Sequence, residues 1–287
     1  MPNSGGHSTL ATFGETYAGL SMKSSMASWG VLLALLSCHP GESVASGIDP
    51  DVEACIRENA PKATAIQDIK LRQVGPLFQE KILTARVYWK QLPDGNSDLL
   101  AVFNEPEDIS GSRLLFLEKK PEKEIYLYMP ALFKVRRITS GRISSSMYGM
   151  DFSYEDFEWL YNMLSTARSE QRADVIVDGE PMYVLAVVPN SASGSKYEEV
   201  VSYFDKQSCV IRKVEFYGGG RKLHKVLSAD PKTVKRISGI FVPHAFVMRD
   251  LEKKSETELT VTHVDIDPPI SDAVFDPAHL KESRGIE

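Results

Sequence analysis

The feature that most restricts the fold of this chain is a series of short apolar runs, separated by turn signals about every ten residues. Asp94-Gly95 is the most specific of these signals, because both central positions of a type I′ hairpin turn need positive φ. Strand and helix signals do not alternate along the chain. The spacing therefore predicts an antiparallel meander in one continuous sheet. The predicted strands cover residues 65–73, 79–90, 98–104, 112–118, 124–129, 174–177, 182–188, 197–205, 210–217, 222–230, 241–250 and 256–265.

Several of these runs are apolar on both faces of the strand, notably 99–103, 114–117, 125–129 and 183–188. A half-solvated antiparallel strand would alternate apolar and polar residues, so both sides of this sheet must be shielded from water. One solution is a mainly β fold with a strongly curved antiparallel sheet, a half or open β-barrel. Its apolar concave face can hold an acyl chain. The other is a two-sheet sandwich without a cavity, and the pattern leaves both open.

Two helices are expected among the strands. Residues 51–58 have helical spacing and precede a helix-breaking Pro61. The segment from Ser153 to Asp156 is a variant of the capping box, and apolar residues then recur at helical spacing as far as Leu164. Because neither a repeat nor a linker interrupts the pattern, we expect residues 47–287 to form one domain.

The first 46 residues have the plan of an upstream extension followed by a secretory signal peptide. Lys23 precedes a short apolar run at 29–36, and helix-breaking and small residues follow it. The polar stretch before Met22 does not fit this role, so we expect translation to start at Met22. Cleavage after Ala45 or Ser46 would release a soluble protein of about 241 residues into the periplasm, which is the route we favour.

The three cysteines pose one question of processing and one of pairing. The segment 35–38 resembles a bacterial lipobox, in which Cys38 would be acylated and would tether the protein, although Leu36 is a poorer fit there than a small residue. The spacing typical of zinc ligands is absent. In an oxidising compartment Cys55 and Cys209 remain as an even pair. They form either a disulfide or two buried thiols.

Composition and motifs argue against several classes of function. The chain has 33 basic and 39 acidic residues and lacks the basic excess of a nucleic-acid-binding protein. No stretch reaches the roughly 20 apolar residues of a membrane-spanning helix. The sequence contains no GxSxG, HExxH, P-loop or dinucleotide fingerprint, and its histidines are scattered. We therefore expect no catalytic residue, no metal and no cofactor.

Two groups of charged residues stand out. Asp151 and Asp156 flank a helix start, where they are better explained as capping groups than as an acid/base pair. Lys134, Arg136 and Arg137 are either ordinary solvated charges or a basic rim beside an apolar mouth. Such a rim would suit anionic head groups or an acidic partner surface.

Two blocks of sequence, residues 126–138 and 149–157, resemble the signature of the outer-membrane lipoprotein-sorting protein family, relatives of the LolA and LolB carriers. The resemblance extends over residues 50–281 and departs at 158–172, which is more helical than the family pattern. Shorter matches follow in the family's order at 177–180, 203–205, 214–217, 239–243 and 274–277.

This resemblance implies a half barrel, closed by helices, whose concave face holds lipid chains in the periplasm of a Gram-negative bacterium. It favours the curved sheet over the sandwich. The implied function is a non-catalytic carrier that takes the acyl chains of a lipid or lipoprotein between membranes or from an exporter. Because relatives are often linked to exporters of the resistance-nodulation-division type, the alternative is an envelope adaptor of such an exporter without lipid cargo. An envelope hydrolase is a third reading, weakened by the missing nucleophile and base.

The carrier interpretation assigns roles to particular residues. The lid is the helix that begins near Phe152, with Phe152, Tyr154 and Trp159 as its contacts, and Trp159 as the anchor that points inward. Lys134, Arg136 and Arg137 form the basic rim. The expected cavity lining consists of Trp89, Phe103, Leu115, Leu117, Tyr126, Tyr128, Phe133, Met182 and Phe216.

Overall fold

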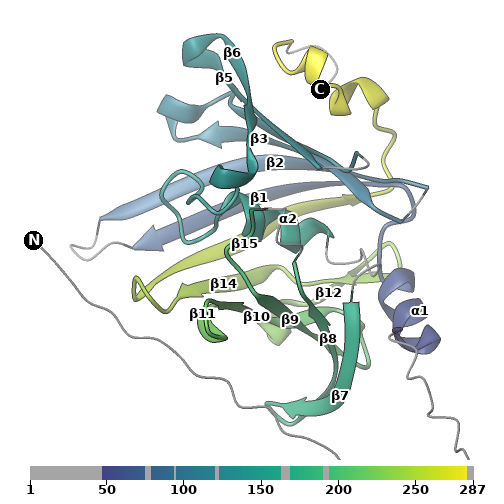
Figure 1. Ribbon diagram of the computed structural model, residues 1–287. Coiled ribbons are helices and arrows are strands. Elements are labelled where there is room, and N and C mark those ends of the chain that lie inside the picture. The colour runs from purple at the N-terminus through teal and green to yellow at the C-terminus, as the bar shows by residue number, and fades with distance from the viewer. Residues whose placement is uncertain are drawn as a thin grey trace, which may run out of the picture. The chain divides into compact units, whose positions relative to one another are not determined.

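The computed structural model describes residues 47–74, 79–93, 95–119, 123–162, 169–189 and 194–282, and within these ranges thirteen antiparallel strands form one curved sheet (Figure 1). The fold is mainly β, as the sequence predicts, and the sheet stays open because β6 and β7 form its two edges. The leader segment, Cys38 and Asp94 lie outside the described residues.

The strands of the large sheet are β1 (Thr64–Val74), β2 (Glu80–Gln91), β3 (Ser97–Glu105), β4 (Arg113–Leu117), β5 (Glu124–Met129), β6 (Lys134–Ile138), β7 (Ser169–Val177), β8 (Glu180–Val187), β9 (Glu199–Asp205), β10 (Ile211–Gly218), β11 (Lys222–Ala229), β14 (Ala245–Asp250) and β15 (Ser255–Ile266). Strands β12 (Lys235–Ile237) and β13 (Ile240–Val242) form a separate hairpin.

Two meanders meet in the middle of the sheet. Strands β1 to β6 pair in sequence order, as do β7 to β11, and β14 and β15 continue the second series. The series join where β15 pairs with β1, in a register that sets Ala65 opposite Ile266 and Gln73 opposite Thr257. The prediction of a single continuous meander is therefore wrong at this point. The last strand, β15, pairs with the first, β1, and no local sequence signal indicates this pairing.

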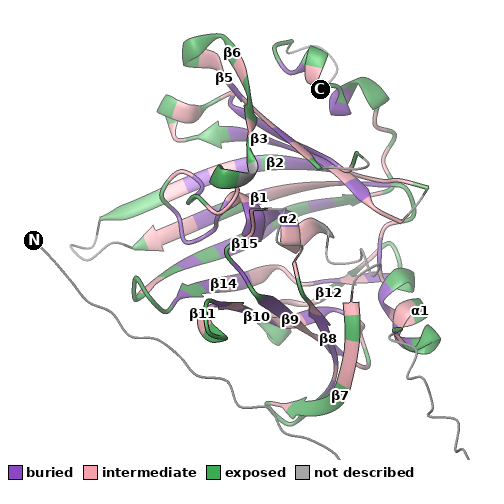
Figure 2. Ribbon diagram, viewed as in Figure 1, coloured by how far each residue is buried: buried purple, intermediate pink, exposed green. Residues whose placement is uncertain are grey.

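Apolar side chains are buried on both faces of the sheet, as the uninterrupted apolar runs predict. Figure 2 shows buried residues along many of the strands. On the concave face, Leu71, Leu83 and Phe103 are completely buried. Helices α1 (Pro50–Glu58) and α2 (Tyr154–Asn162) pack against this face. The two helices therefore supply the shielding that one side of the sheet requires.

The C-terminal residues cover part of the opposite face. Val274, Phe275 and Leu280 are buried there against the side chains of β2 to β5. Arg113 fastens this segment, because its Nη1 donates hydrogen bonds to the carbonyl oxygens of Leu280 (2.6 Å) and Glu282 (3.0 Å). Burial of side chains of this size contributes about 2 kcal/mol each. Two short 3-10 turns, Asp272–Phe275 and Pro277–His279, build this cover.

Two regions of the sheet differ from the predicted strands, one at β13 and β14 and one at β7. The predicted strand 241–250 is divided into β13 and β14 at Pro243, which has no N–H to donate to a ladder. Strand β7 begins at Ser169, five residues before the predicted strand 174–177, and residues 163–168 between α2 and β7 lie outside the described residues.

Helix α1 is fixed at its start by a cap and in its body by a disulfide. The Asp49 side chain accepts a hydrogen bond from the backbone N–H of Asp51 (2.8 Å), and Pro50 occupies the first turn, where a missing N–H costs nothing. Cys55 is bonded to Cys209, with their Cα atoms 5.6 Å apart. The pairing that the sequence left open is present, and it ties α1 to the turn before β10.

Candidate functional site

Helix α2 starts with a reciprocal capping box. The hydroxyl of Ser153 accepts a hydrogen bond from the backbone N–H of Asp156 (3.1 Å), and the Asp156 carboxylate accepts one from the N–H of Ser153 (2.8 Å). Each bond satisfies a backbone donor that a helix start otherwise leaves free. The capping role predicted for Asp156 is therefore confirmed.

Asp156 also forms an ion pair that is shielded from solvent. Its Oδ2 lies 2.5 Å from Nζ of Lys225 on β11, and the two side chains are 0% and 3% exposed. The hydroxyl of Tyr197 donates to the other carboxylate oxygen at 2.6 Å, and Lys225 also donates to the carbonyl oxygen of Asp151 at 2.5 Å. Because desolvation offsets most of the attraction in such a pair, its main effect is to fix the position of α2 on the sheet.

Asp151 does not cap the helix, contrary to the prediction. Its carboxylate accepts hydrogen bonds from Gln73 on β1 (2.9 Å) and from Ser255 and Thr257 on β15 (2.5 and 2.8 Å). Asp151 is completely buried, and a buried carboxylate needs such donors. It joins the loop before α2 to the two strands at which the meanders meet.

Glu155 is a further buried carboxylate on α2. Burial raises the pKa of Glu155 to about 7; a hydrogen bond from Ser195 opposes this rise, and the nearby Asp156 adds to it. Among the described residues, nothing donates a hydrogen bond to its Oε2. Glu155 therefore changes charge near neutral pH within the helix that covers the concave face.

Aromatic side chains make the remaining contacts of α2. Phe157 is completely buried, with its ring centroid 6.1 Å from that of Phe116 and 5.0 Å from that of Tyr161. Of the predicted lid residues, Phe152 is completely buried, and Tyr154 and Trp159 are half-buried against the same core. The segment thus packs tightly on the concave face.

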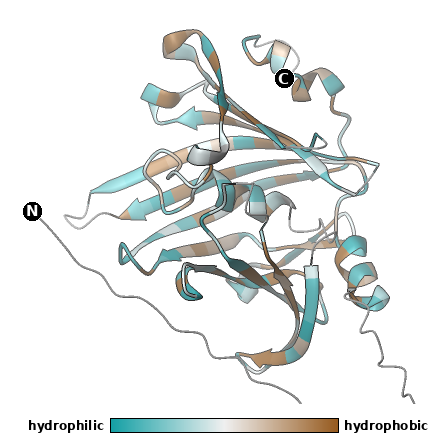
Figure 3. Ribbon diagram, viewed as in Figure 1, coloured by the Kyte–Doolittle hydropathy of each residue, from teal (hydrophilic) through white to brown (hydrophobic). Residues whose placement is uncertain are grey.

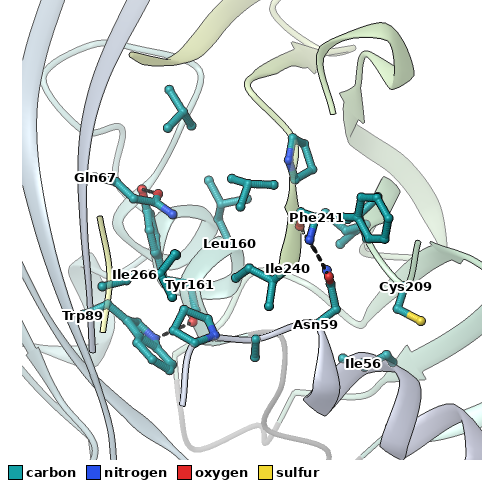
Figure 4. Close-up of a pocket in the computed structure, with 18 of the residues that line it drawn as sticks. Ile56, Asn59, Gln67, Trp89, Leu160, Tyr161, Cys209, Ile240, Phe241 and Ile266 are labelled. Carbon is teal, nitrogen blue, oxygen red and sulfur yellow. Dashed lines mark hydrogen bonds between the residues drawn. The ribbon is translucent and has the colours of Figure 1, made fainter. Parts of the chain in front are cut away.

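A cavity of about 190 Å³ lies next to α2 (Figure 4). Its described lining residues are mostly apolar and include no Asp, Glu, Lys, Arg or His. The walls come from α1 and the residues after it, from α2, from the β12–β13 hairpin and from the concave face of the sheet. The lining residues are Ile56, Asn59, Ala60, Pro61, Ala65, Gln67, Val87, Trp89, Leu160, Tyr161, Phe204, Cys209, Val210, Ile211, Ile240, Phe241, Val242, Pro243, Phe246, Leu259, Val261 and Ile266.

The polar groups of this lining are largely satisfied by the protein. The side chain of Asn59 is paired with the backbone of Phe241, donating to its carbonyl oxygen at 3.0 Å and accepting from its N–H at 2.6 Å. The indole N–H of Trp89 donates to the carbonyl oxygen of Tyr161 (3.3 Å), and the Tyr161 hydroxyl donates to Oε1 of Gln67 (3.2 Å). The amide nitrogen of Gln67 has no hydrogen-bond partner in the part of the chain that the structure describes.

The structure distributes the nine predicted lining residues over both faces. Trp89 lines the cavity, while Phe103 and Phe216 belong to the core of the concave face without bordering the cavity. Phe133 is 81% exposed. Met182 is completely buried, but it alternates with Leu185 of the concave-face core and so lies on the other side of β8.

Four further predicted lining residues lie on the opposite face, which corrects their assignment. Leu115, Leu117 and Tyr128 are buried under the C-terminal segment, and Tyr126 packs against them. Side chains of a strand alternate between faces, so in a run that is apolar throughout, the sequence does not show which residues face the helices. Leu114, next to Leu115, is the one that belongs to the concave core.

The predicted basic residues do not border the cavity. Lys134, Arg136 and Arg137 lie on the edge strand β6, and β5, β4 and β3 separate that strand from β2. Four steps between strands correspond to about 19 Å. The placement of this rim beside the cavity mouth is therefore wrong, because β6 pairs at the far edge of the sheet.

The most informative cavity residues that sequence reasoning missed are Gln67 and Tyr161. Gln67 has a recognisable signal, since it is a polar residue between Ala65 and Ile69 on the buried face of β1. Tyr161 lies on the predicted helix, but nothing local shows that its backbone and hydroxyl meet Trp89 and Gln67. Both contacts depend on the tertiary packing of α2.

Comparisons with known proteins define the class of fold. A putative outer membrane lipoprotein-sorting protein domain from Vibrio parahaemolyticus superposes with a TM-score of 0.72 at 21% identity, covering 80% of this chain and 97% of that one. A DUF1329 family protein from Desulfovibrio piger gives 0.72 at 21% identity, covering 80% and 96%. A LolA superfamily protein from Nitrosomonas europaea gives 0.63 at 18% identity, covering 79% and 96%. The protein therefore has the fold of the LolA and lipoprotein-sorting proteins, as its sequence motifs predict.

Sequence comparison places the chain in a family. A family model described as "-like: Uncharacterized protein" matches residues 95–282, more than half of the chain, and the chain belongs to this family. No protein with a curated description matches the sequence. Neither helix in the described ranges has the length and apolar character required to cross a bilayer.

Proposed function

We propose that this protein is a non-catalytic carrier that binds acyl chains of a lipid or lipoprotein in the periplasm. The observation that supports the proposal most directly is the apolar cavity between α2, α1 and the concave face. Each methylene group transferred from water to such a cavity contributes about 0.8 kcal/mol, so an acyl chain binds without any charged contact. The fold shared with lipoprotein-sorting and LolA superfamily proteins supports the same function.

Helix α2 is the element that we propose to move. Leu160 and Tyr161 at its C-terminal end form part of the cavity wall, whereas its N-terminal end is held by the buried pair of Asp156 and Lys225. The C-terminal end is held by two longer hydrogen bonds of Tyr161, with Trp89 (3.3 Å) and Gln67 (3.2 Å). Breaking these two bonds would let this end swing, which would admit the chain and release it. The lid role of Phe152, Tyr154 and Trp159 is part of this proposal.

The β5–β6 hairpin is proposed as the contact with lipid head groups. Leu132 and Phe133 at its tip are 55% and 81% exposed, and Figure 3 shows this tip as an apolar end of the ribbon. Lys134 and Arg136 follow directly and have no ion-pair partner among the described residues. Exposed apolar groups beside unpaired cations match the surface of an anionic bilayer.

The periplasmic location is proposed from the leader sequence and from the disulfide. A bond between Cys55 and Cys209 persists in an oxidising compartment and is rare in the cytosol. The soluble form, cleaved after Ala45 or Ser46, is the one we propose, and an acylated Cys38 is the alternative. The N-terminal sequence and mass of the mature protein decide between them.

Native mass spectrometry of the protein purified from the periplasm tests the carrier function. We expect additional mass that matches a lipid and that organic solvent removes. The delipidated protein should then bind N-phenyl-1-naphthylamine, a neutral apolar fluorophore. A clean apoprotein that fails to bind this probe would contradict the carrier and favour an envelope adaptor without lipid cargo.

A matched pair of variants localises the binding. Ile266→Trp places a bulky ring in the cavity wall, and Ile270→Trp places one among half-buried residues of the opposite face. We expect the first to weaken probe binding at least tenfold and the second to leave it unchanged. Equal effects of the two substitutions would show that the probe binds elsewhere.

A further inference from the structure

Gln67 is a polar side chain in an apolar row. On the concave side of β1 it lies between Ala65 and Ile69, which are 3% and 2% exposed. Across the ladder it is opposite Val87 on β2 and Val264 on β15. A polar amide in such surroundings costs free energy unless each of its groups finds a hydrogen-bond partner.

The orientation of this amide is set by α2. The hydroxyl of Tyr161 donates to Oε1 of Gln67 at 3.2 Å, and the indole N–H of Trp89 holds the Tyr161 backbone by donating to its carbonyl oxygen at 3.3 Å. Burial raises the pKa of Tyr161 above its ordinary value, so the phenol remains protonated and stays a donor. The amide oxygen is thus engaged by the protein.

The amide nitrogen of Gln67 is left with two donor hydrogens and no acceptor in the described part of the chain. Figure 4 shows this nitrogen at the end of the Gln67 side chain, on the side that faces Leu160 and the other residues of the lining. A donor that points into an apolar cavity calls for an acceptor on the molecule that fills it.

The lining also restricts the charge of that acceptor. No Lys, Arg or His is present among the described residues that line the cavity, so an ionised carboxylate would be buried there without a counter-charge. A neutral carbonyl oxygen accepts a hydrogen bond at a much lower desolvation cost. The site therefore suits an ester or amide carbonyl and disfavours a free fatty acid.

We infer that Gln67 donates a hydrogen bond to the carbonyl oxygen of an ester- or amide-linked acyl chain and thereby selects such chains over free fatty acids and plain hydrocarbon chains. The inference rests on the proposed carrier function and adds the chemical identity of the bound end of the chain. Ester linkage is shared by glycerolipids and lipoproteins, whereas amide linkage occurs in N-acylated proteins and in lipids built on an amino group.

The test measures displacement of N-phenyl-1-naphthylamine from delipidated protein by four ligands with twelve-carbon chains. These are methyl dodecanoate, N-methyl dodecanamide, dodecyl methyl thioether, whose sulfur is only a weak acceptor, and, at pH 8, dodecanoate. In the wild type we expect the ester and the amide to bind about three- to tenfold more tightly than the thioether, which is the range for one hydrogen bond. Dodecanoate should bind more weakly than either. A preference for the amide over the ester would favour an amide-linked chain as the cargo, and the reverse would favour an ester-linked chain.

Two variants separate the amide from the shape of the cavity. Gln67→Met keeps the length of the side chain without a donor and should bring the ester and the amide to the affinity of the thioether. Tyr161→Phe removes the group that orients Gln67 and should reduce the preference for ester over thioether while leaving thioether binding unchanged. Tyr161 would then be a positioning residue.

The outcomes distinguish the two levels of the proposal. Failure of the probe and of all four ligands to bind the wild type would overturn the carrier function itself. Binding of all four with an unchanged ester preference in Gln67→Met would overturn the role of Gln67 alone. Dodecanoate that binds as tightly as the ester would overturn the selection for a neutral carbonyl. Circular dichroism and the midpoint of thermal unfolding show whether each variant is folded.

Discussion

Nζ of Lys225 lies 2.5 Å from Oδ2 of Asp156, and this ion pair between β11 and α2 is shielded from solvent. Removing one partner leaves the other charge buried. We therefore expect Asp156→Asn to lower the free energy of unfolding by about 3–5 kcal/mol, measured by urea denaturation. Glu53→Gln, which breaks the more exposed pair with Arg57 on α1, should cost no more than about 1 kcal/mol.

A second variant keeps this prediction open to refutation. Replacing both partners with apolar residues, as in Asp156→Leu with Lys225→Met, should restore part of the lost stability, because no unpaired charge is left. If Asp156→Asn alone is as stable as the wild type, the ion pair does not hold α2 to the sheet.

Glu155 should make stability depend on pH. Its pKa is raised by burial to about 7 in the folded protein, compared with 4.5 for an ordinary glutamate. The folded state therefore binds the proton more tightly than the unfolded state, and stability falls as pH rises from about 4.5 to about 7. The corresponding loss is about 3 kcal/mol at pH 8.

Glu155→Gln tests this expectation because it removes the titration and keeps the shape. The variant should gain stability at pH 8 relative to wild type and gain little at pH 4.5, as measured by urea denaturation at both values. The exposed Glu58→Gln on α1 serves as the control and should change neither value. A pH profile of Glu155→Gln that runs parallel to that of the wild type would contradict the assignment.

The disulfide should stabilise both the fold and the cavity. It joins residues 154 positions apart, for which the chain-entropy model gives about 5 kcal/mol, and measured losses for native disulfides are about 2–5 kcal/mol. The double variant Cys55→Ala with Cys209→Ala should lose stability in that range. Because Ile56, Asn59 and Ala60 form part of the cavity wall, it should also bind the apolar probe more weakly.

A peptide map without reductant gives an independent check of this bond. A digest of the protein from an oxidising compartment should contain one linked species with Cys55 and Cys209, which separates into two peptides on reduction. Recovery of both peptides with free thiols before reduction would exclude the bond.

The β5–β6 hairpin should bind anionic vesicles. Leu132→Ser with Phe133→Ser removes two exposed apolar groups and should reduce partitioning onto vesicles containing phosphatidylglycerol at least tenfold, measured by sedimentation. Wild-type binding should weaken at high salt, because Lys134 and Arg136 contribute electrostatic attraction.

The opposite edge of the sheet offers a matched control. Val175 and Ile176 on β7 are also exposed, but they lie between Asp174 and Asp178 instead of beside unpaired cations. Val175→Ser with Ile176→Ser should leave vesicle binding unchanged. Equal losses from the two double variants would refute a specific role of the β5–β6 hairpin.

Most strands could be predicted because their signals are local. The strand at 124–129 has the predicted bounds, and the apolar runs correctly indicated that both faces are covered. What covers them could not be predicted equally well. The helices on the concave face carry capping and periodicity signals, whereas the C-terminal cover around Val274 and Phe275 is made of short 3-10 turns without periodicity.

The candidate site was less predictable, for a geometric reason. Trp89 was identified, but Leu115 and Tyr128 were assigned to the wrong face, because a strand that is buried on both sides gives no alternation from which to choose. The cavity wall also draws on segments far apart in sequence, such as Asn59 and Phe241. Their proximity follows from strand order, and strand order depends on the pairing of β1 with β15.

That pairing has a consequence for the order of folding. Each meander consists of neighbours in sequence and can form from local contacts, but the ladder between β1 and β15 closes nearly the whole described chain into one loop. Contacts of such long range form slowly, because the entropy of loop closure is lost before they can contribute. The two halves of the sheet cannot be joined until β15, residues 255–266, has emerged, whether from a ribosome or across a membrane. We therefore expect the two meanders to form first and separately, with the cavity as the last part to form.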